Sequence, residues 1–324
     1  VLSILSDGEE IVNLPHMNET KTIRWGFIGC GEVTEKKSGP AFNLVEGSTV
    51  VAVMSRNAAK AQSYAERHGV KRWYTDAQRL IDDEEVNAVY IATPPSTHAT
   101  YAIMAMKSGK AVYVEKPMAS NYEDCCRINR IAEKTGVPCF VAYYRRCLPY
   151  FEKVRDLVAD GAVGKVVNVQ IRFAVPPRDL DYNSKNLPWR VQPDIAGGGY
   201  FYDLAPHQID LLQQMFGPIT QAEGMKANRG GLYDTEDSVS ACFMFDCGLP
   251  GSGSWCFVAH ESAKEDRVTR VRCRSRCLRT NPSFCRMRRV GRSLWCPIRA
   301  MCSCRSFARW WSICRIRRFV AAIV

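Results

Sequence analysis

Residues 197–207 hold an acid and a histidine whose spacing could support proton transfer. Three glycines precede Asp203, and His207 follows it by four residues. Pro206 lacks a backbone N–H and is tolerated only in the opening turn of a helix, so we expect a helix to begin near Asp203, with both side chains on one face. A histidine titrates near neutral pH and could protonate the alkoxide that forms when hydride is added to a carbonyl. A lone histidine on a helix is usually structural, but Asp203 at this spacing favours catalysis by His207.

A glycine-rich turn at residues 26–34 could hold a phosphate. It lies between a predicted strand and a predicted helix, where free N–H groups and the helix dipole favour anions and glycines let the backbone approach a pyrophosphate. Thr34 stands where a dinucleotide fingerprint has its third glycine, so a plain tight turn is the alternative. The residues expected to contact a dinucleotide here are Gly29, Gly31, Glu32 and Val33.

The end of the next predicted strand indicates which dinucleotide is bound. NAD-binding proteins usually have an acid there that accepts hydrogen bonds from the ribose hydroxyls. This strand instead ends in Met54, Ser55, Arg56 and Asn57, without an acid. Ser55 could hydrogen-bond a 2′-phosphate, and Arg56 could pair with it and stack on the adenine. The sequence therefore favours NADP(H), with NAD(H) as the second candidate and a merely exposed arginine as the alternative.

Two more polar clusters follow predicted parallel strands, at the edge where open α/β sheets bind ligands. One supplies Thr93, Pro94 and His98, and the other supplies Glu115 and Lys116. We expect all five residues beside the cofactor. His98 could instead cap a helix or lie on the surface.

The first half of the chain must bring these residues together. Apolar runs alternate with amphipathic stretches from 22 to 114, which is typical of βαβ units on a parallel sheet. The predicted strands are 23–28, 49–54, 88–92, 110–114 and 138–142, and the predicted helices are 57–68, 77–81, 97–108 and 122–135. We therefore expect a doubly wound α/β domain of the Rossmann type over 17–143.

After Tyr150 the pattern changes to longer strands of the antiparallel type. The predicted elements are a strand at 166–173, a helix at 200–216 and a hairpin of strands at 238–245 and 251–258. We expect an α+β domain with an open, mostly antiparallel sheet over 144–267, and a domain boundary near Tyr144.

Two motifs give the chain a resemblance to a known family. Glu115-Lys116-Pro117 matches the Glu-Lys-Pro signature of the glucose–fructose oxidoreductase, inositol dehydrogenase and rhizopine-catabolism (Gfo/Idh/MocA) family, and residues 197–207 match its glycine pair followed by Asp-x-x-x-His. The resemblance covers roughly 22–267. It implies an NAD(P)-dependent oxidoreductase that transfers hydride between the nicotinamide and a carbonyl or secondary alcohol of a sugar, cyclitol or related diol. It also implies a homo-oligomer, a dimer or tetramer, paired through the open sheet.

This resemblance implies that Lys116, Asp203 and His207 are the catalytic residues. Lys116 would bring fixed positive charge to the substrate oxygen, and Asp203 would orient the sugar or the lysine. A noncatalytic, nucleotide-sensing member of the family is the alternative, and the presence of all three residues argues against it.

Four further residues are candidates for the substrate pocket. Aromatic faces and guanidinium groups suit sugar hydroxyls, so we expect Arg172, Trp189 and Arg190 to contact the substrate. Relatives often have asparagine at the position of Tyr144, so the contacts of Tyr144 with the substrate are expected to differ from theirs.

The formal net charge of +11 comes from the C-terminal end of the chain. Sixteen arginines, and no lysine or acid, lie in 267–324, so the rest of the chain has a slight excess of acids and gives no indication of nucleic-acid binding. Apolar periodicity is lost from 268 onward. When codons that can encode 301–316 are read one base out of register, they give a sequence typical of an amphipathic helix. We interpret 268–324 as an Arg/Cys-rich tail translated out of frame. A module that binds metal or nucleic acid is the alternative, but the tail has no Cys-x-x-Cys pair and no histidine, so we expect no metal site.

An out-of-frame tail would leave the second domain incomplete. The hairpin at 238–258 would then present an open strand edge and an uncovered apolar face, which is an aggregation hazard.

The N-terminal end resembles no targeting signal. Residues 1–16 contain three acids and no basic start, and the chain has no stretch of ~18 uncharged apolar residues. We expect a cytoplasmic protein without a membrane partner. Met17 is interpreted as the native start and 1–16 as a non-native or disordered extension.

Overall fold

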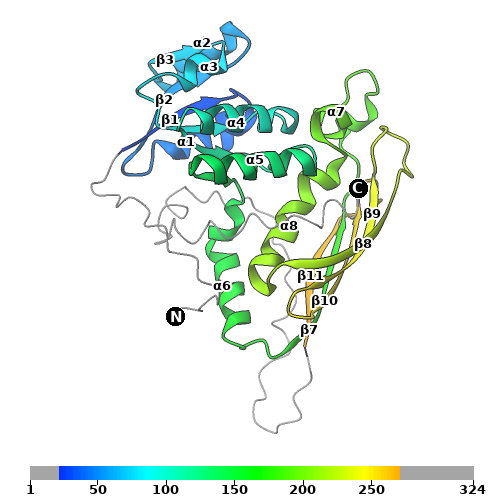
Figure 1. The fold of residues 1–324 in the computed structure, drawn as a ribbon. Helices are drawn as coiled ribbons and strands as arrows, with labels where there is room; N and C mark the ends of the chain where they lie inside the picture. The colour runs from blue at the N-terminus through cyan, green and yellow to red at the C-terminus, as the bar shows by residue number, and fades with distance from the viewer. Residues whose placement is uncertain (1–21, 271–324) are drawn as a thin grey trace.

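Residues 22–270, the part of the chain that the computed structural model describes, form two β-sheets with helices packed against them (Figure 1). The first sheet is parallel throughout, in the order β3-β2-β1-β4-β5-β6. Its strands are β1 Ile23–Ile28, β2 Ser48–Met54, β3 Arg72–Tyr74, β4 Ala88–Ile91, β5 Ala111–Val114 and β6 Cys139–Val141. The chain reverses its direction of winding between β1 and β4, and dinucleotides bind at this switch point in doubly wound sheets. The predicted Rossmann arrangement is confirmed.

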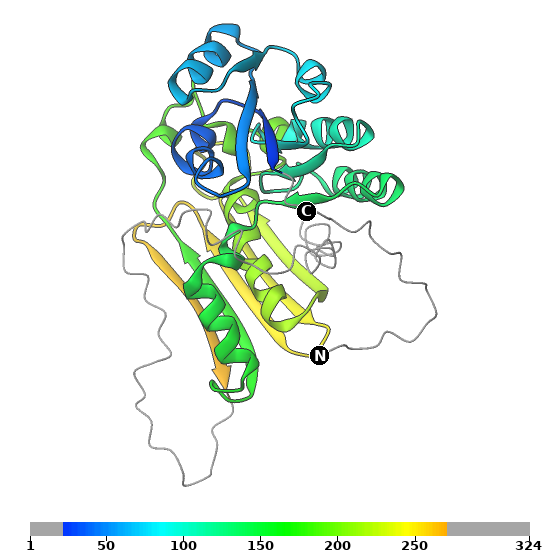
Figure 2. The same cartoon turned by 90° about the vertical axis from the view of Figure 1, so that its left-hand side faces the viewer.

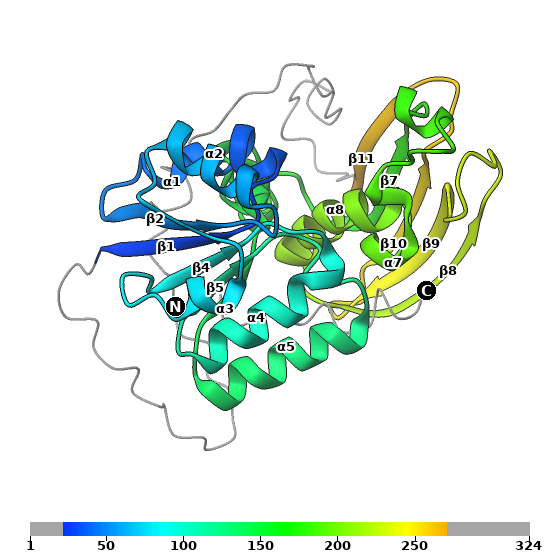
Figure 3. The ribbon, with the colours of Figure 1, turned by 90° about the horizontal axis from the view of Figure 1, so that it is seen from above.

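Helices cover both faces of this sheet (Figure 3). They are α1 Gly39–Phe42 and α2 Ala58–His68 on one face, and α3 Ala77–Ile81, α4 His98–Lys107 and α5 Tyr122–Thr135 on the other. Neighbouring strand residues point to opposite faces. Phe27 and Tyr90 are therefore buried with Tyr64 of α2, while Ile28 and Ile91 are buried in the cluster that α3, α4 and α5 complete.

The two longest helices of this domain have sequence-encoded ends. The side chains of Asn57 and Asn121 accept backbone hydrogen bonds at the N-termini of α2 and α5. Gly69 and Gly136 end these helices in the left-handed conformation that glycine adopts without strain. These caps explain why the bounds of both helices could be predicted closely.

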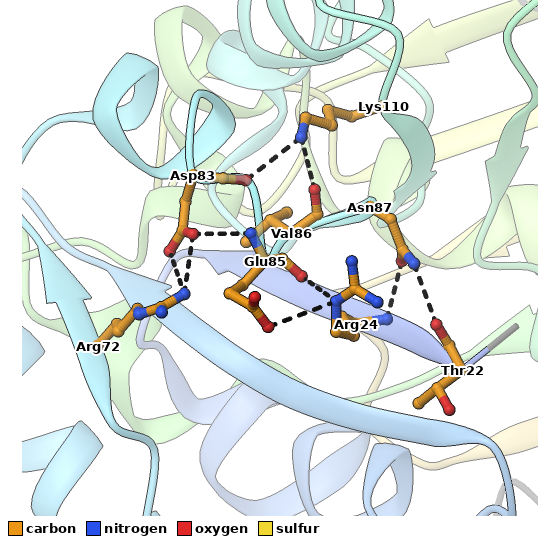
Figure 4. A network of polar contacts seen from close by, with 8 residues as sticks. All are labelled: Thr22, Arg24, Arg72, Asp83, Glu85, Val86, Asn87 and Lys110. Carbon is orange, nitrogen blue, oxygen red and sulfur yellow. Dashed lines mark hydrogen bonds and ion pairs between the residues drawn. The ribbon is translucent and has the colours of Figure 1, made fainter.

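A polar network fastens the amino end of the first sheet (Figure 4). Lys110 Nζ donates to the carbonyl of Val86 at 2.6 Å and to that of Asp83 at 3.2 Å. The Asp83 carboxylate accepts from Arg72 at 2.9 Å, and Asn87 accepts from the backbone N–H of Arg24 at 2.8 Å. These bonds join the segment before β4 to β1, β3 and β5, at the end of the sheet away from the carboxyl-edge loops.

The second sheet has the order β11-β7-β10-β9-β8 and is antiparallel except for the β7–β10 pair. Its strands are β7 Val166–Ala174, β8 Ile219–Ala227, β9 Ser238–Phe245, β10 Pro250–Cys256 and β11 Ala263–Arg270. Helix α8 Tyr200–Phe216 covers one face, and α6 Pro149–Ala159 lies beside α8 (Figure 2). Buried and exposed residues alternate along β9, which is the pattern of a sheet with one solvated face. The predicted open, mostly antiparallel sheet is confirmed.

The hairpin of β9 and β10 does not have the free edge that the sequence predicted. The outer side of β9 pairs with β8, and the outer side of β10 pairs with β7. The expectation of an open edge and an uncovered face at this hairpin is therefore wrong, because the predicted strand β7 and the unpredicted strand β8 flank it and α8 packs on its apolar face. A second unpredicted strand, β11, extends the sheet beyond β7. β11 continues through residues 268–270, which pair with β7.

Helix α8 begins at Tyr200, which agrees with the predicted range 200–216 and contradicts the start near Asp203 inferred from Pro206, so Pro206 lies inside the helix. A proline inside a helix removes one hydrogen bond and crowds the carbonyl four residues earlier, a cost that packing must offset. Tyr200 and Phe201 are 2% and 5% exposed in the core of the second domain, and this burial stabilises the turn that precedes Asp203.

Among the described residues, the structure contains no helix long and apolar enough to span a membrane. Residues 22–270 also hold no group of three or more His, Cys, Asp or Glu arranged for a metal ion. The extension 1–16 and residues 271–324 lie outside the described residues, as do the out-of-frame interpretation and its metal- or nucleic-acid-binding alternative.

Candidate active site

The glycine-rich turn leaves the carboxyl end of β1 at the switch point of the sheet. Gly29 has a φ of +112°, and a Cβ there would lie 2.8 Å from the carbonyl oxygen of Ala92, so this position requires glycine. A Cβ on Gly31 would meet nothing within 4 Å. Glu32 is exposed and Val33 half-buried, where the helical turn η1 Val33–Lys37 begins. The protein itself therefore leaves open space beside Gly31.

Thr34 fastens the turn from inside. It is fully buried, and its hydroxyl is 2.9 Å from the carbonyl oxygen of Gly31 and 3.2 Å from that of Gly29. The carbonyl of Thr34 accepts a hydrogen bond from Tyr64 at 3.0 Å, and a Cβ on Gly39 would lie only 1.8 Å from the same oxygen. Thr34 thus replaces the third glycine of the fingerprint with a side chain that hydrogen-bonds within the turn. Position 39 in turn requires glycine, because a side chain there would clash with the carbonyl oxygen of Thr34.

A buried chain of hydroxyl and carboxyl groups connects this turn to β5. Ser38 Oγ and Tyr90 OH are 2.6 Å apart, and Tyr90 OH donates to Glu115 Oε1 at 2.6 Å. Burial raises the pKa of Glu115, against the lowering effects of its hydrogen bond from Tyr90 and of the Lys116 charge. The sequence suggested Glu115 but not Ser38 or Tyr90, because an aromatic residue in a buried strand gives no sign of a polar contact.

The end of β2 presents an exposed arginine. Ser55 Oγ accepts from the backbone N–H of Asn57 at 3.3 Å, and Asn57 in turn caps α2 by accepting from Lys60 at 3.0 Å. Arg56 lies between them with an exposed side chain, and it forms no ion pair or hydrogen bond through its guanidinium within residues 22–270. Its donors therefore face solvent beside the first residue of α2.

Thr93, Pro94 and His98 follow β4. Thr93 Oγ1 accepts from Thr97 at 2.7 Å, and Pro94 precedes the short helix η2 Pro95–Thr97. His98 is 1% exposed, so the surface role considered for it is wrong. Its two ring nitrogens lie 2.7 Å from the carbonyl oxygen of Thr93 and 2.9 Å from that of Pro117. His98 thus joins the loops that follow β4 and β5.

Lys116 reaches from the end of β5 to helix α8. Its Nζ lies 2.5 Å from Asp203 Oδ1 and also donates to the Asp203 carbonyl at 2.8 Å, on the turn that contains Pro206. Arg190 Nε donates to Asp203 Oδ2 at 3.1 Å, so each carboxylate oxygen has a cation beside it. Burial raises the pKa of Asp203, but the charges of Lys116 and Arg190 outweigh it and hold the pKa below its usual value. Asp203 is therefore ionised and binds Lys116 to α8.

His207 lies one helical turn after Asp203 and is 4% exposed. The ring of Tyr144, which is 41% exposed, meets the His207 ring edge to face with centroids 5.4 Å apart. Two residues beyond Tyr144, the buried guanidinium of Arg146 donates to Asp210 of α8 at 2.7 Å. This buried ion pair fixes the segment with Tyr144 against α8, and it explains why Tyr144 lies over His207.

Comparison with known protein families identifies the family to which this chain belongs. The model of the oxidoreductase family with an NAD-binding Rossmann fold matches residues 23–143, and the model of the GFO/IDH/MocA C-terminal domain matches residues 151–276. The chain belongs to the Gfo/Idh/MocA oxidoreductase family. The resemblance that the two motifs indicated is confirmed, and with it the assignment to the NAD(P)-dependent dehydrogenases and reductases.

Relatives in the Gfo/Idh/MocA family include proteins named as oxidoreductases, reductases and dehydrogenases. The chain is 42% identical over 243 residues to Oxidoreductase P35 of Formosa agariphila, which covers 75% of either chain. It is 28% identical to the 1,5-anhydro-D-fructose reductase of Ensifer adhaerens, over 70% of this chain and 67% of that enzyme. Among solved structures, a levoglucosan dehydrogenase in complex with NADH is 25% identical with a TM-score of 0.68, over 76% of this chain and 70% of that one.

The remaining substrate candidates divide into two groups. Arg190 lies in the site, with its guanidinium 4.5 Å from the centre of the Trp189 ring. Arg172 is exposed on β7 between the buried Ile171 and Phe173, and so it points away from the sheet face that α8 covers. The structure therefore does not bring Arg172 together with Asp203 and His207, because the alternation along a strand reverses the face at every residue.

Proposed function

We propose that this member of the Gfo/Idh/MocA family catalyses reversible hydride transfer between NADP(H) and a carbonyl or secondary alcohol of a sugar, cyclitol or related diol. The observation that carries the proposal is the contact of Lys116 with Asp203 one turn from His207. Sugars or sugar derivatives also stand in the names of the 1,5-anhydro-D-fructose reductase and of a D-xylose dehydrogenase of Paenarthrobacter nicotinovorans. The latter is 28% identical over 57% of this chain and 49% of that enzyme. In this proposal, residues 17–143 bind the dinucleotide and residues 144–267 bind the substrate and a second copy of the chain.

The three residues have distinct roles in the proposed reaction. His207 holds or releases the proton of the reacting hydroxyl, since a histidine changes charge near neutral pH. Lys116 places a positive charge where the oxygen becomes negative. Asp203 holds the ammonium of Lys116 through Oδ1 at 2.5 Å and thereby sets its direction. The nicotinamide, when bound, supplies or accepts the hydride.

The carboxyl edge of the first sheet fits a dinucleotide. Gly31 has open space where a pyrophosphate would approach, and Gly29 keeps the turn close to β4. His98 contributes by positioning the loops after β4 and β5, because its ring nitrogens face their carbonyls. The residues proposed to surround the cofactor are Gly29, Gly31, Glu32, Val33, Ser55, Arg56, Thr93, Pro94, His98, Glu115 and Lys116.

We further propose that NADP(H) is preferred over NAD(H). The exposed guanidinium of Arg56 follows β2 at the position where an acid would hold the ribose hydroxyls of NAD. A 2′-phosphate there would receive charge-assisted hydrogen bonds from Arg56, and the hydroxyl of Ser55 lies next to it in the chain. NAD(H) would meet no acid at this position in the described structure.

Turnover measurements with the full chain test the proposed activity. A panel of sugars, cyclitols and diols is incubated with NADP⁺ and with NAD⁺, and formation of the reduced nicotinamide is followed by its absorbance. We expect turnover of at least one polyol, faster with NADP⁺ at equal concentration. A chain that binds NADPH in titration but turns over no compound would instead be a nucleotide sensor, and the proposed reaction would be wrong.

A further inference from the structure

Arg178 lies beside the proposed catalytic residues without belonging to them. It is on the connection between β7 and α8, and its guanidinium lies 4.3 Å from the centre of the Tyr200 ring. Tyr200 precedes Asp203 by three residues on α8, so the two side chains share one side of the helix. The stacked guanidinium is therefore held next to the Lys116–Asp203 pair.

The connection that carries Arg178 is fastened to α8. Asp181 is 1% exposed, and its two oxygens accept from the backbone N–H of Arg178 at 2.8 Å and from the hydroxyl of Tyr200 at 2.5 Å. These two hydrogen bonds fix the backbone at Arg178 and the ring on which its side chain stacks. Arg178 thus differs from an ordinary surface arginine, whose position is not defined.

Two cations contact Asp203 directly, and a third lies near it. Lys116 and Arg190 lie beside its two carboxylate oxygens, and the charge of Arg178 also lowers the pKa of Asp203, after those two. Three further acids lie in this region: Glu115 interacts with Lys116 and Asp203, Asp181 accepts from the Tyr200 hydroxyl, and Glu236 accepts from the N–H of Gly199. Within residues 22–270 none of these acids forms an ion pair with the Arg178 guanidinium, so its charge is available to a ligand.

The donors of Arg178 are also left for a ligand. Its side chain is exposed, and within residues 22–270 its guanidinium takes part in no ion pair or hydrogen bond. A guanidinium that contacts an aromatic ring through its Cζ keeps its N–H groups available, and these can bind a carboxylate with two parallel hydrogen bonds. Arg190 stacks on Trp189 in the same way, but its Nε is already bonded to Asp203.

We propose that the substrate carries a carboxylate that Arg178 binds, so that the enzyme acts on a sugar acid in preference to the neutral sugar. This inference rests on the proposed function and names its substrate class. In the oxidation direction a secondary C–H of the sugar acid gives its hydride to NADP⁺, the hydroxyl proton passes to His207, and a keto sugar acid and NADPH result. The carboxylate is unchanged and serves only for binding.

The test uses matched pairs of hexoses and their uronic acids, namely glucose and glucuronate, galactose and galacturonate, and mannose and mannuronate, together with glucose 6-phosphate. Binding of each to the complex of the full chain with NADP⁺ is measured by calorimetry, and turnover is measured in parallel. We expect at least one uronate to bind about tenfold or more tightly than its hexose, because one charge-assisted contact has that effect. Arg178→Gln should remove this preference and leave binding of the hexose unchanged.

Arg172→Gln is the matched control, since Arg172 is exposed on the opposite face of the sheet. It should leave every preference as it is. Equal binding of acid and hexose in all pairs, or a preference that Arg178→Gln does not reduce, would overturn the inference. Tighter binding of glucose 6-phosphate than of any uronate would also overturn it, in favour of a phosphorylated substrate. Uronate binding that depends on Arg178 without turnover of any compound would support the inference and refute the proposed reaction.

Discussion

The two ends of the first sheet carry similar residues and use them differently. At the amino end, Arg24, Arg72 and Lys110 donate to acceptors that lie within the same domain (Figure 4). At the carboxyl end, Arg56 is exposed without an acceptor in the described residues, and Lys116 is bound by an acid that lies 87 residues away in the chain. Donors that are bound within one domain, as at the amino end, indicate a stabilising role. A free guanidinium such as that of Arg56, or an ammonium held by the other domain such as that of Lys116, indicates a functional one.

The same comparison separates stability from function. The amino-end network connects strand ends to one another, and its loss should loosen the sheet. The carboxyl-end residues face the switch point, where ligands bind in open α/β sheets, and their loss should affect catalysis or cofactor binding more than folding. Substitutions at matched residues of the two ends can therefore break or support this division.

The largest effect is expected at the contact of the two domains. Lys116→Met and His207→Ala should each lower turnover by about 10²-fold or more, because one removes charge stabilisation of the reacting oxygen and the other removes proton transfer. NADPH affinity, measured by fluorescence titration, should stay within about twofold. Lys110→Met, at the amino end, should leave turnover unchanged. Near-normal turnover of either active-site variant on a verified substrate would show that its residue has another role.

Arg56→Ala tests the carboxyl end alone. It should weaken NADPH by about 1.5–3 kcal/mol, which is roughly ten- to a hundredfold, because it removes a charge-assisted contact with the 2′-phosphate. NADH should bind the variant and the original protein about equally. Arg24→Ala serves as the control at the amino end and should alter neither affinity. Equal losses for NADPH and NADH would contradict the NADP(H) preference.

Asp83→Ala tests the opposite end. The Asp83 side chain is 7% exposed and accepts from Arg72, from Tyr74 OH at 3.0 Å and from the backbone N–H of Glu85 at 2.9 Å. Its removal leaves these donors without an acceptor, so the free energy of unfolding in urea should fall by about 1–3 kcal/mol. NADPH affinity of the folded variant should be unchanged. A loss of cofactor affinity with unchanged stability would contradict the division between the two ends.

Most of the fold could be predicted because its signals are local. The strand-to-glycine transition at 26–34 and the caps of α2 and α5 are readable within a few residues. The strands β8 and β11 were not predicted because they lie at the edges of the sheet and are largely solvated. Seven of the eight residues of β8 after Ile219 are exposed, and β11 lacks a regular alternation of apolar residues. Patterns of apolar residues in a sequence indicate burial. β8 and β11 are instead held in the sheet by backbone pairing with β9 and β7, which leaves no such pattern.

The site could be predicted only where its residues belong to a motif. Lys116, Asp203 and His207 were proposed in this way, although no sequence pattern predicts the contact of Lys116 with Asp203 across 87 residues. The pattern of residues predicted the range 200–216 correctly, but the argument from Pro206 placed the start of α8 near Asp203, because burial of Tyr200 and Phe201 offsets the cost of Pro206 and depends on the tertiary fold. The stacking of Arg178 on Tyr200 was missed for the same reason.

The smallest predicted effect concerns His98, which is buried in the fold and also positions the loops beside the proposed cofactor site. Burial lowers the pKa of His98, and this outweighs the raising effect of the carbonyls of Thr93 and Pro117. The unfolded chain therefore takes up a proton near pH 6.5 that the folded protein resists, and the free energy of unfolding should fall as the pH decreases below about 6.5. Above that pH, the contribution of His98 to the free energy of unfolding should be constant.

Urea unfolding between pH 5 and pH 8 measures this effect. His98→Asn should reduce the loss of stability at low pH, while His260→Asn, at an exposed position, should not. Because one pKa unit corresponds to about 1.4 kcal/mol, the slope should be resolvable by a full titration series. If the two carbonyls instead held a charged His98, its contribution would have the opposite sign, and stability would rise as the pH decreases. His98 would then bind the two loops as a cation, and its contacts with the carbonyls of Thr93 and Pro117 would weaken as the pH rises and the ring loses its proton.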